Sequence, residues 1–419
     1  MIREAESLYD CLVNEKLDIS IAKSEFIDIV SHWQYDSLKK LVDYSLENDH
    51  DNIELLKGLL MLGIDLNVES STGNSILFYV LDSKSKKKSN VFECLVKAGA
   101  DVNVKLRNSQ KTPLLVYFCS RYAGSDSTGL LKLLLDKGAD PNKPTKFGLY
   151  PILVICNKAS GCKLLEKLKI LVEYGADVNV KSITGKTPLL SLLERNKHSD
   201  CHEAIEYLIK HGADASVKDC YSISALFYAR EQSMIKLLIE NGADVNSRDM
   251  DRKTLLFRCC EKKSYEKIEF IRYLIEKGAD PNICDNRGSS CLIEACKGNK
   301  GSNQLELIKL LIESGANVNE YMLNGTTPLI AITESYEGKG LESIVDVLLS
   351  SGASVNAMNN ERHTPLLNIS RSYFDDSLPK IVSALIKAGA NIKVVDKNRK
   401  SAADYLSERH ESILNVQEI

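Results

Sequence analysis

The stretch LVEYGADVNVKSITGKTPLL, from Leu171 to Leu190, decides the fold. An apolar helix end leads into Gly175, and the segment DVNV that follows alternates polar and apolar residues, which predicts a short exposed β-strand of a finger. Gly185 allows a tight turn with positive φ. In the pair Thr187-Pro188, threonine caps free N–H groups and proline at the first helical position loses no hydrogen bond. The stretch therefore predicts a helix end, a finger and a new helix.

The same phrase recurs along nearly the whole chain. Its key glycines, each in a G-[AI]-[DNS] context, are Gly63, Gly99, Gly138, Gly175, Gly212, Gly242, Gly278, Gly315, Gly352 and Gly389. Successive gaps are 36, 39, 37, 37, 30, 36, 37, 37 and 37 residues. Such a period indicates a repeat array, in which each unit packs on its neighbours and 419 residues need not divide into separate globular cores.

Two helices are expected between successive key glycines. After Thr187-Pro188 a short first helix runs from Leu189, and the polar loop RNKHSDCH follows. The second helix, Glu203 to Lys210, carries an apolar stripe. That stripe consists of Ile205, Leu208 and Ile209. Gly212 is the expected left-handed cap at its end.

The pattern GADVN, a glycine turn, TPL, and a helix such as MIKLLIENGAD resembles the ankyrin repeat over about residues 35–407. The resemblance implies a β-hairpin finger and two antiparallel helices per unit, stacked into a curved solenoid. We therefore expect an all-α repeat solenoid of about ten units. The expected organisation is a helical N-terminal cap (1–34), the repeat array (35–389), and a C-terminal capping repeat with a polar tail (390–419).

The chain departs from the family pattern in four ways. Most gaps exceed the usual period of about 33 residues, and the extra residues fall between the two helices. The copy after Gly212 is only 30 residues long. The histidine that usually follows TPL is replaced by Leu115, Leu153, Leu190, Ile330 and Leu367, which predicts apolar packing instead of a polar link. The glycine of the finger turn is replaced by Ser222, Arg252, Arg362 and Arg399, so these turns should be strained or differently shaped.

Composition excludes several function classes. A net charge of −3 with 26% charged residues argues against nucleic-acid binding, which needs a basic face. The lysine run SKSKKKS at 83–89 is interpreted as a solvated loop rather than a targeting or phosphate-binding segment. The twelve cysteines show no disulfide spacing, and no signal peptide or membrane-spanning run is evident. A cytoplasmic location is predicted, with the nucleus or a host-cell cytosol as alternatives.

Signals of catalysis or metal binding are weak. The sequence lacks a glycine-rich phosphate loop, a G-x-S-x-G elbow and an HExxH motif. The cluster HSDCH at 198–202 is interpreted as a solvated loop rather than a metal site, and Cys284, Cys291 and Cys296 lack a Cys-x-x-Cys pair. We therefore predict no catalytic, cofactor or metal site, and a protein that is not an enzyme.

The predicted function is a non-catalytic protein–protein interaction scaffold, monomeric, that binds another protein through its finger tips and the concave face of its first helices. Tip residues differ between copies whereas the framework repeats. The candidate partner-binding residues are Phe147, Tyr221, Met250, Tyr321, Met322 and Met358, with the basic Arg107 and Lys146. Aromatic and methionine side chains are favoured interface anchors, although each could instead cover the neighbouring finger. Basic tips followed by acidic or mixed tips predict a partner with one negative and one neutral region.

Two alternatives concern other surfaces and modifications. The inter-helix loops offer a second candidate surface. We interpret their extra length as sequence drift under weak constraint rather than as a binding feature, because loop closure entropy grows slowly with length and a longer loop costs little stability. The aromatic residues of these loops are Tyr122, Tyr265, Tyr336, Tyr373 and Phe374. The finger asparagine, in some family members a target of hydroxylation, is interpreted as a hydrogen-bonded bridge between fingers. It stands at Asn103, Asn142, Asn179, Asn246, Asn282, Asn319 and Asn356.

The sequence leaves two alternative functions. Long repeats with TPLL resemble the ankyrin arrays of poxviruses, protists and intracellular bacteria, which implies a host-directed effector or substrate adaptor. A ubiquitin-ligase adaptor is not favoured, because the 30 residues after Gly389 read as a cap without an F-box-like segment. An enzyme-linked effector is disfavoured, because residues 1–60 are too short and lack a His/Cys/Asp arrangement.

Overall fold

The computed structural model describes residues 34–47, 56–57, 60, 63–122, 124, 126–158, 162–195, 201–261, 268–297, 303–335, 340–372 and 377–409. The expected N-terminal cap lies outside these residues except for Gln34, and so do the polar tail 410–419 and the loop aromatics Tyr265, Tyr336, Tyr373 and Phe374.

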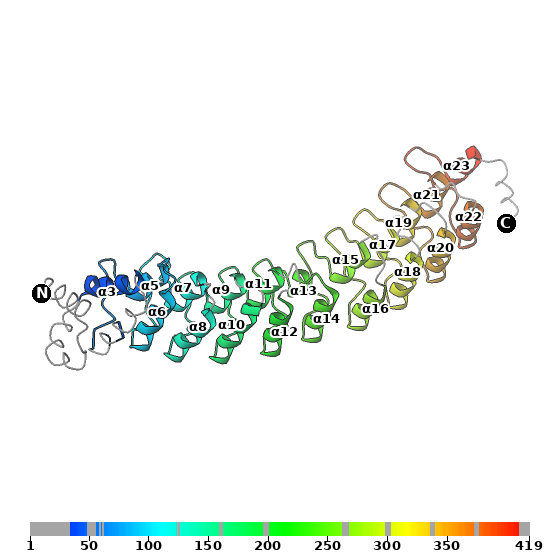
Figure 1. Cartoon of the computed structure of the whole chain (residues 1–419). Helices are drawn as coiled ribbons and strands as arrows, with labels where there is room; N and C mark the ends of the chain where they lie inside the picture. Colours follow the sequence, from blue (N-terminus) through cyan, green and yellow to red (C-terminus); the bar gives the residue numbers. More distant parts are fainter. Residues whose placement is uncertain are drawn as a thin grey trace, which may run out of the picture. The chain divides into compact units, whose positions relative to one another are not determined.

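Helices follow one another in pairs (Figure 1). After α3 (Tyr35–Glu47), the first helices are α5 (Ile76–Asp82), α7 (Leu114–Arg121), α9 (Pro151–Lys158), α11 (Pro188–Arg195), α13 (Ala225–Tyr228), α15 (Leu255–Glu261), α17 (Cys291–Cys296), α19 (Pro328–Ser335), α21 (Pro365–Ser372) and α23 (Ala402–Arg409). The second helices are α6 (Lys88–Lys97), α8 (Ser127–Asp136), α10 (Cys162–Glu173), α12 (His202–Lys210), α14 (Gln232–Glu240), α16 (Ile268–Glu276), α18 (Gln304–Glu313), α20 (Leu341–Ser350) and α22 (Leu378–Lys387). The predicted repeat of two helices per key glycine is confirmed.

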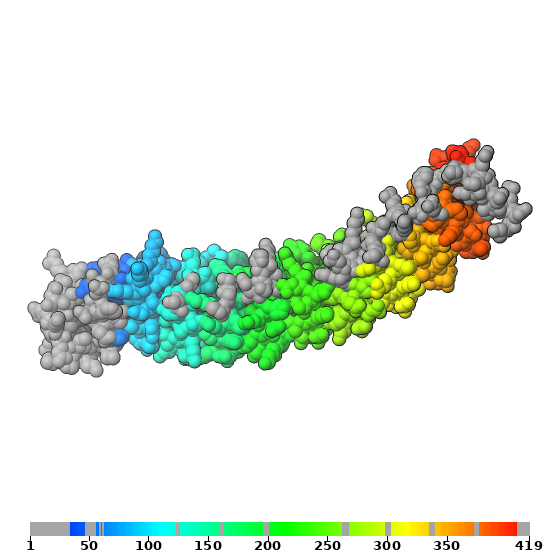
Figure 2. All heavy atoms as spheres, turned by 45° about the vertical axis from the view of Figure 1, so that its right-hand side comes forward, coloured from blue at the N-terminus to red at the C-terminus, as the bar shows by residue number. Residues whose placement is uncertain are grey.

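The chain forms two compact units. The first runs to Cys220 and includes Tyr228–Arg230, and the second comprises Tyr221–Phe227 and the chain from Glu231 onward. Within the first unit α5, α7, α9 and α11 pack in succession, as do α6, α8, α10 and α12. Within the second unit α15, α17, α19, α21 and α23 pack likewise, and so do α18, α20 and α22. On the face shown in Figure 2 the colours change in bands along each unit, as expected when a repeat touches only its neighbours.

Apolar side chains fill the space between successive helices. On α12 the buried residues are Ala204, Ile205, Leu208 and Ile209, which confirms the predicted stripe. The residues that replace the family histidine are buried as expected. Their exposed fractions are 2% for Leu115, 1% for Leu153, 0% for Leu190 and Ile330, and 3% for Leu367. Each such side chain contributes roughly 1.5–3 kcal/mol of hydrophobic stabilisation.

The first helices begin as the sequence predicts. In α11 the N–H of Leu190 donates to Thr187 Oγ1 at 3.3 Å, so the threonine caps an N–H that the helix leaves free. Thr254, Thr327 and Thr364 do the same. Proline is the first residue of α9, α11, α19 and α21, whereas in α7 it lies one residue before the helix.

The prediction of a β-strand in the finger is wrong. Val178 and Asn179 lie in a turn, because Asp177 Oδ1 accepts the N–H of Asn179 at 2.8 Å and so takes a group that a strand would pair. Among the described residues β-pairing is limited to isolated bridges, at Glu69–Ser75, Lys105–Pro113 and Val395–Ser401. The alternation in DVNV reflects burial of Val178 and Val180, each 7% exposed, rather than a sheet.

The finger turns that lack glycine are strained, as predicted, but their backbone keeps the positive φ of the turns that contain glycine. Arg252 has φ 63° and Arg362 has φ 64°, close to Gly185 at 71°. In the finger of Arg252, Asp249 Oδ1 accepts the N–H groups of Asp251 and Lys253 at 2.8 and 2.9 Å. These bonds impose the left-handed conformation on the arginine, which costs about 1–2 kcal/mol for an L residue with a side chain.

We expect Arg252→Gly to stabilise the protein by about 1 kcal/mol, because glycine adopts this φ without the steric cost. Thermal unfolding followed by circular dichroism measures the gain. The matched control is Arg248→Gly, an exposed arginine of the same finger without positive φ, which should leave the midpoint unchanged or lower it. A lower midpoint for Arg252→Gly would contradict this explanation of the turn.

Candidate partner-binding surface

Each finger is tied to the next by an asparagine side chain. Asn179 Nδ2 donates to the carbonyl oxygen of Gly212 at 2.8 Å, and its Oδ1 accepts the N–H of Asp214 at 2.8 Å. The same two bonds link the fingers at Asn103, Asn142, Asn246, Asn282, Asn319 and Asn356. The bridging role expected for these asparagines is confirmed, and it fixes the separation of adjacent fingers within each unit.

Backbone hydrogen bonds also join the fingers near their tips. In the first unit Lys146 N–H donates to the oxygen of Gln110 at 2.8 Å. In the second unit Leu323 N–H donates to the oxygen of Arg287 at 3.0 Å. Because the bonds use backbone atoms, the side chains at the tips can vary while the backbone stays in place. The tips are therefore ordered before any partner arrives, which lowers the entropic cost of binding.

Most of the predicted anchors are exposed on these tips. The exposed fractions are 48% for Phe147, 65% for Tyr221, 72% for Met250, 65% for Tyr321 and 50% for Met358. A large part of each of these side chains is therefore open to solvent. Their part in binding stays a prediction.

Three predicted residues differ in their surroundings. Met322 is half-buried, and its backbone closes a turn by bonding Thr326 and Gly325. Arg107 is exposed but forms an ion pair with Glu69 at 2.6 Å on the adjacent finger. Lys146 is exposed and forms no ion pair with a described residue.

Two further tip residues are exposed and apolar but are neither aromatic nor methionine, so residue type did not predict them. Ile183 is 74% and Leu323 is 79% exposed. Both stand eight residues after a key glycine, the position that Met250 occupies in its own copy. A rule based on position within the repeat, rather than on residue type, predicts both as exposed.

Charges on the first helices are largely paired with their own fingers. Lys186 contacts Glu194 at 2.5 Å and Lys253 contacts Glu261 at 2.6 Å, each pair eight residues apart. The hydrogen bond that Lys253 donates to Glu261 raises the pKa of Lys253. Lys400 and Glu408 repeat this ion pair at the same spacing. The first helices therefore offer a partner fewer unpaired charges than the tips do.

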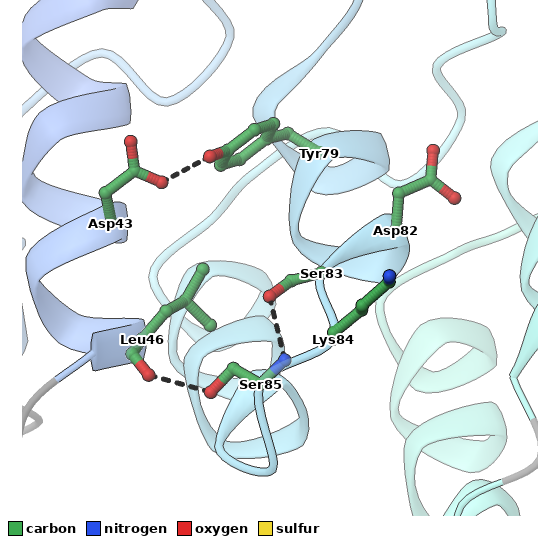
Figure 3. A pocket seen from close by; sticks show the side chains of 7 residues that line it. All are labelled: Asp43, Leu46, Tyr79, Asp82, Ser83, Lys84 and Ser85. Carbon is green, nitrogen blue, oxygen red and sulfur yellow. Dashed lines mark hydrogen bonds between the residues drawn. The ribbon is translucent and has the colours of Figure 1, made fainter.

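A hollow of about 350 Å³ lies between α3 and α5 (Figure 3). Its carboxylates already have partners: Tyr79 donates to Asp43, and Tyr117 donates to Asp82. Burial, together with the bond to Asp82, raises the pKa of Tyr117 to about 12, so the phenol is protonated at neutral pH. The bond from Tyr79 on α5 to Asp43 on α3 therefore stabilises the packing of the two helices, and we interpret the hollow as a packing contact rather than as a reactive centre.

Of the residues that the sequence offers for chemistry, His198 lies outside the described part of the chain. Burial raises the pKa of the Cys119 thiol to about 12, which keeps it unreactive. His202 lies 3.5 Å from Glu206 on α12. Among the described residues no three or more His, Cys, Asp or Glu side chains come together as metal ligands. Within the same residues no helix has the length and apolar character required to cross a bilayer.

Comparison with known proteins agrees with this architecture. A family profile described as "Ankyrin repeats (3 copies)" matches residues 153–249, 256–359 and 300–396, which together exceed half of the chain. Among solved structures, the chain is similar to the ankyrin repeat domain of Bcl-3, described as a unique member of the IkappaB protein family. The two share 23% identity over 58% of this chain and 100% of that domain, with a TM-score of 0.42.

We expect Asn179→Ala to destabilise the first unit by about 1–3 kcal/mol, because it leaves the Gly212 carbonyl and the Asp214 N–H without their partner. Faster hydrogen exchange at the Asp214 amide, measured by NMR or mass spectrometry, reports the broken bridge directly. Asn157→Ala is the matched control, because that asparagine is exposed on α9. Unchanged exchange at Asp214 would show that Asn179 does not hold the two fingers together.

Proposed function

This chain belongs to the ankyrin-repeat family, and from that premise we propose that it is a non-catalytic scaffold that binds another protein. Ankyrin repeats are in general protein–protein interaction modules. We propose that the partner contacts the finger tips and the concave face expected of the first helices. We further propose a monomer that acts in the cytoplasm.

The observation that carries this proposal is the exposure of large apolar side chains on ordered tips. A single exposed apolar residue needs no explanation, whereas a group of them on neighbouring fingers often marks an interaction site. Tyr321, Leu323 and Met358 are 65%, 79% and 50% exposed, and we call them the apolar tip cluster. Asn360 ties their two fingers together, since its N–H donates to the oxygen of Asn324 at 2.8 Å and its side chain approaches the oxygen of Leu323 at 3.5 Å.

The cluster has the features of an interface centre. It presents an aromatic, a methionine and a leucine side chain on neighbouring fingers, and polar residues surround it. Glu320 is half-buried beside Tyr321, and Asn324 and Arg287 are exposed. Apolar anchors within a polar rim are the usual arrangement of a protein interface, where a few residues contribute most of the affinity.

The second candidate function is a host-directed effector or substrate adaptor. The observation that favours it is the gap of 36–39 residues with TPLL, which resembles poxvirus, protist and intracellular-bacterial arrays. This candidate uses the same tips and differs only in the source of the partner. Identification of that partner therefore separates the two candidates.

We expect replacement of the apolar tip cluster by serine (Tyr321→Ser, Leu323→Ser, Met358→Ser) to weaken partner binding by more than about 30-fold, the effect of removing a hot spot worth 2 kcal/mol. Affinity purification with quantitative mass spectrometry identifies proteins that the wild type retains and the variant loses, and their affinities are then measured by calorimetry.

The matched control replaces three exposed polar residues on second helices of the same unit, Glu269→Ser, Lys309→Ser and Glu313→Ser. It should retain the partner. Equal retention by both variants would exclude the cluster as the anchor, and equal loss from both would indicate a general change of surface or stability, which thermal unfolding would reveal.

A further inference from the structure

The finger tips of the first unit carry lysines in four consecutive copies. Lys105, Lys181 and Lys218 each stand six residues after a key glycine. Lys143 and Lys146 stand five and eight residues after Gly138. All five are exposed, and we call them the basic tip row.

No lysine of the row forms an ion pair with a described residue, and the aspartates of the same fingers accept backbone N–H groups. Asp140 Oδ1 accepts the N–H of Asn142 at 2.8 Å, and the aspartates of the other fingers bond in the same way. Asp219 accepts the hydroxyl of Tyr228 at 2.7 Å. Glu69 is paired with Arg107. The lysines of the row are therefore not held in ion pairs by described residues, while the carboxylates of the same fingers stay charged and accept hydrogen bonds within their own fingers.

An apolar centre lies within the row. Phe147 is 48% exposed and follows Lys146 directly, and Ile183 is 74% exposed and lies two residues after Lys181. Ile183 Cγ2 would lie 3.5 Å from a side-chain carbon at Gly148, so the isoleucine sits against the turn that follows Phe147. Two neighbouring fingers thus present exposed apolar side chains within two residues of exposed lysines.

We propose that the basic tip row binds an extended acidic protein segment whose apolar side chain contacts Phe147 and Ile183. This inference rests on the proposed function and names the chemistry of the partner. An extended chain can present successive carboxylates to lysines of successive fingers, while the apolar contact supplies a dry centre.

A protein segment fits this surface better than a nucleic acid does. Each finger of the row begins with an aspartate, at 101, 140, 177 and 214, whose charge would repel a continuous phosphate backbone. A peptide can place neutral residues opposite these aspartates. The net charge of −3 also lacks the excess of positive charge that phosphate binding requires.

The test uses the full chain and a fluorescent synthetic peptide in which glutamates flank a central leucine and phenylalanine. Anisotropy titration should show binding that weakens with added salt, since exposed charges are screened. The same peptide with glutamine in place of glutamate should bind at least about tenfold more weakly.

Charge reversal of the row (Lys143→Glu, Lys146→Glu, Lys181→Glu) should weaken binding of the glutamate peptide at least about tenfold. The matched control reverses three exposed lysines on second helices (Lys132→Glu, Lys210→Glu, Lys309→Glu), which changes the net charge equally and should alter binding less than about twofold. Phe147→Ser tests the apolar centre without changing the charge, and it should weaken binding as well.

Three outcomes would overturn the inference. These are equal loss in both charge-reversal variants, equal binding of the glutamate and glutamine peptides, and tighter binding of labelled single-stranded RNA or of phosphatidylserine vesicles than of the peptide. The apolar tip cluster separates this result from the proposed function. If the peptide does not bind, but the serine variant of Tyr321, Leu323 and Met358 still loses a protein that the wild type retains, only the acidic-segment inference fails. If the wild type binds neither the peptide nor a partner protein, the proposed function fails as well.

Discussion

The bond pair made by the finger asparagine is the constraint on which the rest of the molecule depends. One side chain supplies both a donor and an acceptor, so Asn142 reaches the carbonyl oxygen of Gly175 and the N–H of Asp177 together. A change in finger spacing would break both bonds at once. Ser216 stands at the equivalent position of the copy after Gly212, and its hydroxyl donates to Asp214 of its own finger at 2.6 Å. The shorter side chain of Ser216 therefore stabilises its own turn.

The repeated parts of the fold could be predicted because they obey local rules. The glycine period, the threonine cap and the proline start each act within one turn of chain, so the bounds of α11 and α12 follow from the sequence. The finger could not be predicted in the same way. Alternation in DVNV is compatible with a strand, and only the bonds from Asp177 and from the adjacent asparagines show that backbone groups are used elsewhere.

The candidate surface was predicted less completely, because it depends on how neighbouring copies align. Arg107 looks like an available cation in the sequence, yet Glu69, thirty-eight residues earlier, lies beside it once the fingers are stacked. Met322 and Leu323 are adjacent in the chain, but the first closes a turn and the second points into water. Exposure at a tip is thus a property of position in the repeat, which residue type alone does not reveal.

The atoms that hold adjacent fingers together are different from the side chains that the tips expose. Adjacent fingers are held by asparagine side chains and by backbone groups, such as the Cys220 N–H on the oxygen of Thr184 at 3.2 Å, so the tip side chains contribute little to holding the stack. The position six residues after the key glycine illustrates the result. It holds Lys181 in the first unit but Tyr321 in the second, on fingers that share the same asparagine bridge. A single backbone site can therefore carry a charged or an apolar side chain without change to the fold.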